Sequence, residues 1–575
     1  MVRKDKILSG QKNFYFEDYQ YSENINFSKK NNIEISFNRV SFIFFVFVII
    51  ASIYSFKIFY LAFIDNENYF VNTTYSKKIR IRQDIVDRKG SIIAKTVNFH
   101  DAAISPKLIL DKEKLLINLR IIFPNLNYSE ISKKLKNDKF FYIKKRLTED
   151  EKTNLWLIGN KAIIFEKKQF RIYPQKNLFS HVIGQIDDNN TGISGIEKYF
   201  DNKLKKRKSK NQPLNLTLDS NLQYIIRNEL INAQFHFKNI GAAAILMNVE
   251  NGEVLSLVSL PDYDLNKRTL INNDIFLNKI TLGVYELGSV FKTFTIAAGL
   301  ENEVIKPNTV FKKLKNKLTC DKYTITEHDK LPENLSAEQI LVRSSNIGAV
   351  RIAQKIGIEK YRSFLNNLDL LNKVNFDLEE IGTPLDFKWG KCKLATSSYG
   401  HGITTTPLQL ARAYAILGNG GYKINPYILK KDKKFFEKNQ QIISKETSDI
   451  INSMLRKVVS LEEGTANFAD IKGYEVGGKT GTAVKYNSEA KLNTFVSIFP
   501  TSRPKYVLLV MLDEPKPAPH FVYEFPPSKK FPKGYKYKGE KRNTSGWNTV
   551  VVAGKIIEKI GPILAINNLQ ASNNY

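Results

Sequence analysis

The feature that constrains this chain most is one apolar segment near its N-terminus. From Val40 to Phe56 the sequence carries no charged residue, and after Lys57 a second apolar stretch continues to Ile64. A helix needs about 20 apolar residues to cross a bilayer, and a lysine near its end can extend its ammonium group to the interface. We therefore predict a transmembrane helix over residues 40–64, preceded by a polar tail over residues 1–39.

The charges beside this segment predict its orientation. Lys29, Lys30 and Arg39 precede the apolar residues, and the flank that is richer in Lys and Arg stays in the cytoplasm. A cleaved signal peptide would have a shorter apolar core that begins closer to Met1. A helix buried in a soluble domain is the other alternative. We expect a single-pass anchor with a cytoplasmic N-terminus and with the remaining chain on the far side of the membrane.

Composition excludes several other classes of protein. The 575 residues carry a net charge of +30, but Lys is abundant from end to end and no nucleic-acid-binding motif accompanies it, so we expect no nucleic-acid partner.

Cys320 and Cys392 are far apart in the sequence. We predict two free, buried thiols, although an oxidising compartment would permit a disulfide. The six His residues form no metal-binding pattern, so we expect neither a metal nor a cofactor.

The length favours at least two domains. Residues 65–212 mix short apolar alternations with charged stretches and end in a Lys- and Arg-rich run that we interpret as a solvated linker. We predict a non-catalytic pedestal domain there. From Leu214 the pattern changes to a strand, an amphipathic helix and a hairpin at Asn251-Gly252. Helices, three strand candidates near residues 475–512 and a closing helix follow. Residues 213–575 therefore predict an α/β (α+β) domain with an antiparallel sheet flanked by helices.

Three short motifs in this second domain carry the chemistry. Ser289 is followed by Lys292 at the expected start of a helix, where both side chains share one face. A lysine in a dry pocket loses basicity and can remain a neutral amine, which could take the serine proton. Ser344-Ser345-Asn346 and then Lys479-Thr480-Gly481-Thr482 follow in the sequence. This ordered set is typical of penicillin-binding proteins and serine β-lactamases.

From about residue 77 to its end, the chain resembles the class B penicillin-binding proteins. Residues 82–90 are similar to the family pattern R-G-x-I-x-D-R-x-G, with Gln83 in place of Gly. Residues 285–292 are similar to Y-E-P-G-S-x-F-K, with Leu287 in place of Pro. Residues 399–421 and 545–566 resemble the division type rather than the elongation type. The resemblance implies a penicillin-binding, serine β-lactamase-like transpeptidase domain behind an elongated pedestal. It also implies a bacterial inner-membrane anchor and a periplasmic catalytic domain.

The resemblance implies acyl transfer to peptidoglycan stem peptides. Ser289 would attack the carbonyl between two terminal D-alanines, and the amine of a neighbouring stem would then complete the crosslink. The other roles follow from the matched motifs: Lys292 as base, Ser344 as proton relay, Asn346 and Lys479 on the donor peptide, Thr480, Gly481 and Thr482 in substrate binding, and the N–H groups of Ser289 and Thr482 as oxyanion hole.

The strand that carries Lys479 raises a geometric question. Strict alternation puts Lys479 and Thr482 on opposite faces, and a twist or bulge at Gly481 could bring both to the site. Gly477, Gly478 and Gly481 predict a bare strand edge against which an extended peptide can lie.

Several alternatives stay open. A D,D-carboxypeptidase would use the same Ser289 with water as acceptor, an elongation-type transpeptidase would act elsewhere in the wall, and an inactive scaffold would only recruit partners. A β-lactamase is disfavoured, because no E-x-x-L-N motif lies between Asn346 and Lys479. Expected partners are β-lactam antibiotics, a membrane glycosyltransferase that polymerises lipid II, and division proteins. The basic segment 516–542 is either a solvated loop or a surface over the cleft for glycan, lipid or a partner.

Overall fold

The computed structural model describes residues 29–63, 82–137, 139–206, 212–267, 274–321, 323–431, 440–486, 488–525, 532–539 and 542–573. Its contacts divide the chain into two units, Met1–Ile79 and Arg80–Tyr575.

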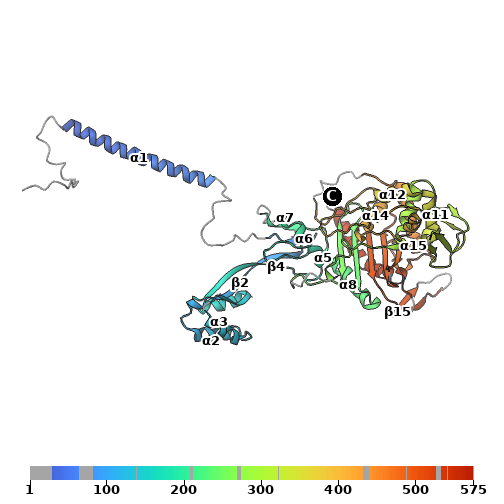
Figure 1. Cartoon of the computed structure of the whole chain (residues 1–575), viewed down its shortest axis with the longest axis horizontal. Coiled ribbons are helices and arrows are strands. Elements are labelled where there is room, and N and C mark those ends of the chain that lie inside the picture. The colour runs from blue at the N-terminus through green and yellow to red at the C-terminus, as the bar shows by residue number, and fades with distance from the viewer. Residues whose placement is uncertain are drawn as a thin grey trace, which may run out of the picture. The chain divides into compact units, whose positions relative to one another are not determined.

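The first unit contains the helix α1, Lys29–Phe63 (Figure 1). Its stretch Val40–Tyr60 is long and apolar enough to cross a membrane, and none of it is buried. The predicted apolar helix is therefore confirmed. The helix includes Lys29 and so extends into the predicted tail; no Pro or Gly lies between Lys29 and Val40 to oppose it.

The pedestal begins the second unit and is built around the long strand β2. Strand β2 pairs antiparallel with β3 and β4, and the short strand β1 pairs antiparallel with β2 and parallel with β5. Three helices pack at the far end of this sheet around their own core, which includes Leu115, Leu119 and Leu135. The elements are β1 (Ile85–Val86), β2 (Ile92–Ile104), α2 (Lys112–Ile122), α3 (Tyr128–Lys136), β3 (Phe141–Leu147), α4 (Glu149–Leu157), β4 (Ile163–Ile172) and β5 (Leu214–Asn215).

A buried ionic cluster fixes the base of the pedestal. Arg82 and Glu197 are both fully buried, and Arg82 Nε lies 2.5 Å from Glu197 Oε2. Arg82 Nη1 lies 2.6 Å from Asp201 Oδ1, and Arg171 Nε lies 2.8 Å from Glu197 Oε1. Removing one partner would leave an uncompensated buried charge, which typically costs about 3–5 kcal/mol. The cluster therefore ties residue 82 to β4 and to the short helices α6 (Gly195–Tyr199) and α7 (Asp201–Lys205).

The domain that follows the pedestal is built on one five-stranded sheet in the order β12-β13-β14-β6-β7. Every neighbouring pair in it is antiparallel, as the sequence predicts. Strands β6 and β7 form the hairpin predicted at Asn251-Gly252, and β12 lies at the free edge. The strands are β6 (Gly241–Asn248), β7 (Val254–Leu260), β12 (Gly477–Val484), β13 (Lys491–Phe499) and β14 (Tyr506–Asp513).

Helices cover this sheet in two layers. In one layer, α8 (Ser220–Phe237) packs on β6 and β7, and α16 (Thr549–Asn573) packs on β13, β14 and α8. In the other, α14 (Pro407–Gly418) packs on the central strands and α15 (Lys445–Ser460) packs on β12. Figure 1 shows the strands of this sheet side by side, with α8, α14 and α15 around them. The edge strand β12 therefore packs against α15 on one of its faces.

One expectation about this domain was wrong. Cys320 and Cys392 form a disulfide with their Cα atoms 5.6 Å apart, and both residues are only half-buried. Cys320 ends β9 (Lys317–Cys320), which forms a hairpin with β10 (Tyr323–Thr326), and Cys392 lies on α13 (Lys391–Ser397). A sequence separation of 72 residues hides this meeting from any local pattern. Asp321 lies close to both sulfurs, but disulfide sulfur is not the thiolate that metals bind.

Candidate active site

Ser289 lies on a short 3₁₀ turn, Gly288–Phe291, and Lys292 begins the helix α9 (Lys292–Glu301) that follows it. The sequence predicts this order of elements, with the 3₁₀ turn in place of the first α-helical turn. Gly288 adopts a φ of +66°, and a Cβ atom there would lie 2.9 Å from Thr482 O on β12. A glycine at this position therefore lets the turn that carries Ser289 lie directly against the edge strand.

The hydroxyl of Ser344 lies between two buried amines. Lys292 Nζ donates to Ser344 O at 2.5 Å and to Ser344 Oγ at 3.1 Å, and Lys479 Nζ donates to Ser344 Oγ at 2.9 Å. Both lysines have 0% exposed surface, whereas Ser289 is 8% exposed. Lys292 N donates to Ser289 O in the backbone, but within the described residues no hydrogen bond joins Ser289 Oγ to Lys292 Nζ. The structure thus brings the three motifs together, with Ser344 as the hydrogen-bonded partner of Lys292.

Burial sets the protonation of this pair. Desolvation lowers the pKa of Lys292 to about 7, although the Glu327 carboxylate opposes that shift. Desolvation and then the charge of Lys292 hold the pKa of Lys479 well below its usual range. Two ammonium groups that share one hydroxyl in a dry interior repel each other. One amine is therefore neutral near pH 7, and a neutral amine can accept a proton.

The backbone at Ser344 is strained in a way that aims its side chain. Ser344 has a φ of +62° and lies between α10 (Ala337–Val342) and α11 (Asn346–Ile356). A non-glycine residue in this left-handed region costs about 1–2 kcal/mol. Ser345 follows as the N-cap of α11, and its Oγ accepts from Gly348 N at 2.9 Å. This tight turn directs both Ser344 oxygens towards Lys292.

Asn346 presents an unused hydrogen-bond acceptor. Its Nδ2 donates to Thr326 O at 2.8 Å, while its Oδ1 is buried and has no partner among the described residues. An unsatisfied buried acceptor costs about 1–3 kcal/mol. The N–H of a substrate amide would satisfy this oxygen, which fits the role that the resemblance implies for Asn346.

Strand β12 lines the other side of the site without a bulge. Its pairing with β13 is unbroken from Gly477 to Val484, so no bulge, one of the two irregularities considered at Gly481, is present there. Thr480 and Thr482 face the cleft, and the long side chain of Lys479 reaches Ser344 from the opposite face. A Cβ atom on Gly481 would collide with Leu287 O just before the nucleophile turn. This glycine therefore permits close approach of the turn.

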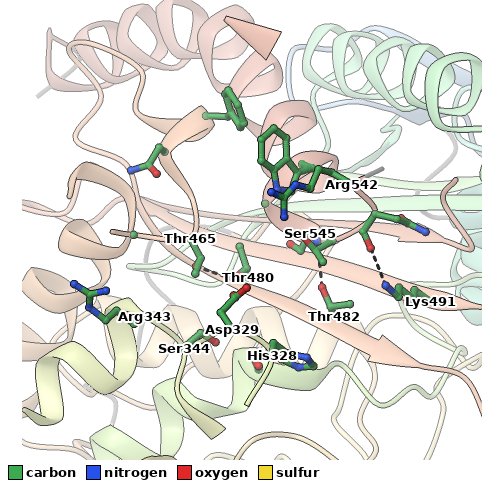
Figure 2. A pocket seen from close by; sticks show the side chains of 18 of the residues that line it. His328, Asp329, Arg343, Ser344, Thr465, Thr480, Thr482, Lys491, Arg542 and Ser545 are labelled. Atoms are coloured by element: carbon green, nitrogen blue, oxygen red, sulfur yellow. Dashed lines mark hydrogen bonds between the residues drawn. The ribbon is translucent and has the colours of Figure 1, made fainter. Parts of the chain in front are cut away.

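The motifs open into one cleft of about 630 Å³ (Figure 2). Thr465 and Thr480 share a hydrogen bond across its wall at 2.9 Å, and Ser545 N donates to Thr482 Oγ1 at 3.1 Å. The basic segment 516–542, for which the sequence leaves a solvated loop and a surface over the cleft open, contributes Phe525 and Arg542 to the lining; residues 526–531, 540 and 541 of it lie outside the described residues. Ser545 and Trp547 of the family-like segment 545–566 also line the cleft, although sequence reasoning assigned them no role there. Sequence reasoning missed further lining residues because no motif marks them: Glu327, His328, Asp329, Arg343, Thr465 and Lys491.

Comparisons with known proteins agree with this geometry. Residues 242–524 match the penicillin binding protein transpeptidase domain, and residues 80–221 match the penicillin-binding protein dimerisation domain. The chain therefore belongs to the penicillin-binding proteins that join a dimerisation domain to a transpeptidase domain, as the resemblance implies.

Individual relatives align over most of the chain. A probable peptidoglycan D,D-transpeptidase FtsI of Caulobacter vibrioides is 30% identical over 501 residues, which cover 84% of this chain and 82% of that protein. The peptidoglycan D,D-transpeptidase FtsI of Buchnera aphidicola subsp. Baizongia pistaciae is 31% identical over 487 residues, covering 76% and 82%. The stage V sporulation protein D of Bacillus subtilis is 28% identical over 483 residues, covering 76% and 74%.

The strain at Ser344 predicts a separation of stability from activity. Ser344→Ala and Ser344→Gly both remove the hydroxyl, so both should slow acylation by a β-lactam by about 100-fold or more. The glycine variant should nevertheless be more stable than the alanine variant by about 1 kcal/mol, because glycine adopts a φ of +62° without strain. Thermal unfolding of the two purified variants measures this difference. Equal unfolding midpoints would contradict the strain.

The lowered pKa of Lys292 predicts a pH dependence. The amine can accept the Ser289 proton only when it is neutral, so the acylation rate constant should rise with pH through about 7. Acylation by a penicillin, followed from about pH 5.5 to about pH 8.5, reports this ionisation in the free enzyme. Lys292→Arg, which stays charged, should be inactive across the range. A wild-type profile that is flat around pH 7 would rule out Lys292 as the titrating base.

Proposed function

We propose that this chain crosslinks peptidoglycan stem peptides as a serine D,D-transpeptidase with Ser289 as its nucleophile. One observation carries the proposal: Ser289 lies against the edge strand β12 in the same cleft as Ser344, whose hydroxyl hydrogen-bonds to the buried amines of Lys292 and Lys479. This arrangement supplies a nucleophile, a base and a proton relay in one place. A non-enzymatic scaffold would not need two buried lysines, which are costly to maintain.

The proposed reaction has two halves. A donor peptide extends along β12, Ser289 Oγ attacks the carbonyl between its two terminal D-alanines, and Lys292 accepts the serine proton. The N–H groups of Ser289 and Thr482 stabilise the oxyanion; losing one such donor typically costs about 100- to 1,000-fold in rate. Ser344 relays a proton to the leaving amine, and the terminal D-alanine departs.

The second half regenerates the enzyme. The amine of a neighbouring stem attacks the acyl carbon, its proton returns through the same relay, and the new amide bond releases Ser289. Asn346 Oδ1, which lacks a partner among the described residues, holds the donor amide throughout. In the first half, before the terminal D-alanine departs, Lys479, Thr480 and Thr482 bind its carboxylate, and Gly481 keeps this strand close to the nucleophile turn.

We further propose that the protein works at the division septum from the bacterial inner membrane. The apolar helix α1 supports a single-pass anchor, and the basic residues before it support a cytoplasmic N-terminus and a periplasmic catalytic domain. The division-type sequence of residues 399–421 and the two relatives named FtsI support a septal role. Its partners are then division proteins and a membrane glycosyltransferase that polymerises lipid II, because the two domains matched in this chain are a dimerisation domain and a transpeptidase domain.

Labelling with a fluorescent penicillin tests the enzyme assignment. The full-length protein in detergent should carry one covalent adduct on Ser289, located by mass spectrometry, and Ser289→Ala should carry none. Ser502→Ala, on an exposed loop, serves as the control and should label normally. A stem pentapeptide with a free acceptor amine should yield a crosslinked dimer with release of one D-alanine. Release of D-alanine without a dimer would instead identify a carboxypeptidase.

Depletion of the protein in its own cells tests the septal assignment. Cells that lose a septal transpeptidase continue to elongate without dividing, so we expect filaments under the microscope. Cells that lose an elongation-type enzyme become round, and rounding would overturn the septal proposal while leaving the chemistry intact.

A further inference from the structure

The segment that follows β10 lies in the cleft but belongs to none of the three motifs. Its first residue, Glu327, makes three close contacts with the motif that contains Asn346. The carboxylate accepts from Ser345 Oγ at 2.6 Å, from Asn346 N at 2.7 Å and from Ile347 N at 3.0 Å. Glu327 therefore binds the start of α11 directly.

These donors are groups that a helix leaves unpaired. The first N–H groups of an α-helix have no partner within it, and a carboxylate placed there is favourable because the helix dipole is positive at this end. Here the N-cap Ser345 already bonds to Gly348 N, so Glu327 from a separate segment completes the end. The position of α11 is thereby coupled to the position of residue 327.

The neighbouring residue fixes the orientation of the Asn346 amide. Thr326 O accepts from Asn346 Nδ2 at 2.8 Å, which leaves Asn346 Oδ1 as the free acceptor. Thr326 and Glu327 together therefore hold both the backbone and the side chain of Asn346. Ser344, two residues earlier on the same tight turn, depends on the same anchorage.

The hairpin that presents Glu327 is itself held. Cys320 at the end of β9 is bonded to Cys392 on α13, and α13 packs on α11 as well as on β9. Strand β10, which ends at Thr326, also packs on α11. The segment before Glu327 is thus attached to the same helices that its carboxylate organises.

We propose that Glu327 is a positioning residue of the reaction: its carboxylate holds the N-terminus of α11 and so sets Ser344 Oγ and Asn346 Oδ1 relative to Ser289. This inference rests on the proposed function, because it assigns those two atoms the roles given above. Glu327 does not itself touch the reacting atoms in this arrangement; it acts through α11.

The negative charge of Glu327 allows a second, independent measurement of its positioning role. The ionisable groups that face Lys292 are Lys479 from β12 and Glu327 and His328 from the segment after β10. Of these, Glu327 is the group that raises the pKa of Lys292, against the effect of burial. Neutralising it should lower that pKa and move the rising limb of the acylation profile to lower pH.

The test compares three variants with a matched control in the full-length protein. Glu327→Gln should lower the rate constant of acylation by a penicillin by about 10- to 100-fold with a much smaller change in initial affinity, and should shift the pH limb downwards. Glu327→Ala should lose more activity. Glu327→Asp should also be slower but should keep the limb near its wild-type pH. Stopped-flow acylation separates the rate constant from the affinity.

Glu301→Gln is the control, because Glu301 similarly accepts from the N–H and hydroxyl of Ser444 at the start of α15 but does not line the cleft. It should leave the rate constant and the pH limb unchanged. If Glu327→Gln lowers only the unfolding temperature or the fraction of protein that labels, with a normal rate constant and limb, the positioning role is wrong. If the wild-type protein does not label on Ser289, the proposed function fails instead.

Discussion

The site depends on one costly arrangement: two lysine amines without solvent contact that share a single serine hydroxyl. Lys292 comes from a helix, Lys479 from an edge strand and Ser344 from a tight turn, and all three must meet within hydrogen-bonding distance. Burial lowers the pKa of both amines, which favours their neutral form over the usual ammonium ion. The five-stranded sheet and its two helical layers can be understood as the support that keeps these three elements in place, because any relaxation would admit water and restore the ordinary basicity of lysine.

Two features with an unfavourable free energy lie in the proposed active site. Ser344 occupies a left-handed backbone conformation, and Asn346 Oδ1 is buried without a partner in the described part of the chain. Each costs on the order of 1–3 kcal/mol. The elements around them are well satisfied: Ser345 and Glu327 complete the start of α11, and β12 pairs with β13 over its whole length. A stable surrounding structure thus holds an unfavourable centre ready for a substrate.

Local sequence patterns predicted much of this molecule and failed where distant segments meet. The apolar helix, the hairpin at Asn251-Gly252 and the antiparallel sheet follow from periodicity and turn residues, and the three motifs were identified by their resemblance to a known ordered set. The Cys320–Cys392 pairing and the contact of Glu327 with α11 do not, because no short-range pattern records which segments the fold brings together. Alternation along β12 places Lys479 on the face opposite to Thr482, which suggested that a twist or bulge was needed to bring both to the site. No bulge is needed, because the long side chain of Lys479 reaches the site from its own face.

The disulfide has a topological consequence. Cys320 and Cys392 enclose the whole stretch that contains α10, α11 and the turn at Ser344, so this stretch is a covalently closed ring within the chain. A protease that cut one peptide bond inside the ring would not separate the molecule into two pieces. Both fragments would remain joined through sulfur, and the nicked protein would stay one covalent molecule, heavier by the one water added in hydrolysis, until the disulfide was reduced.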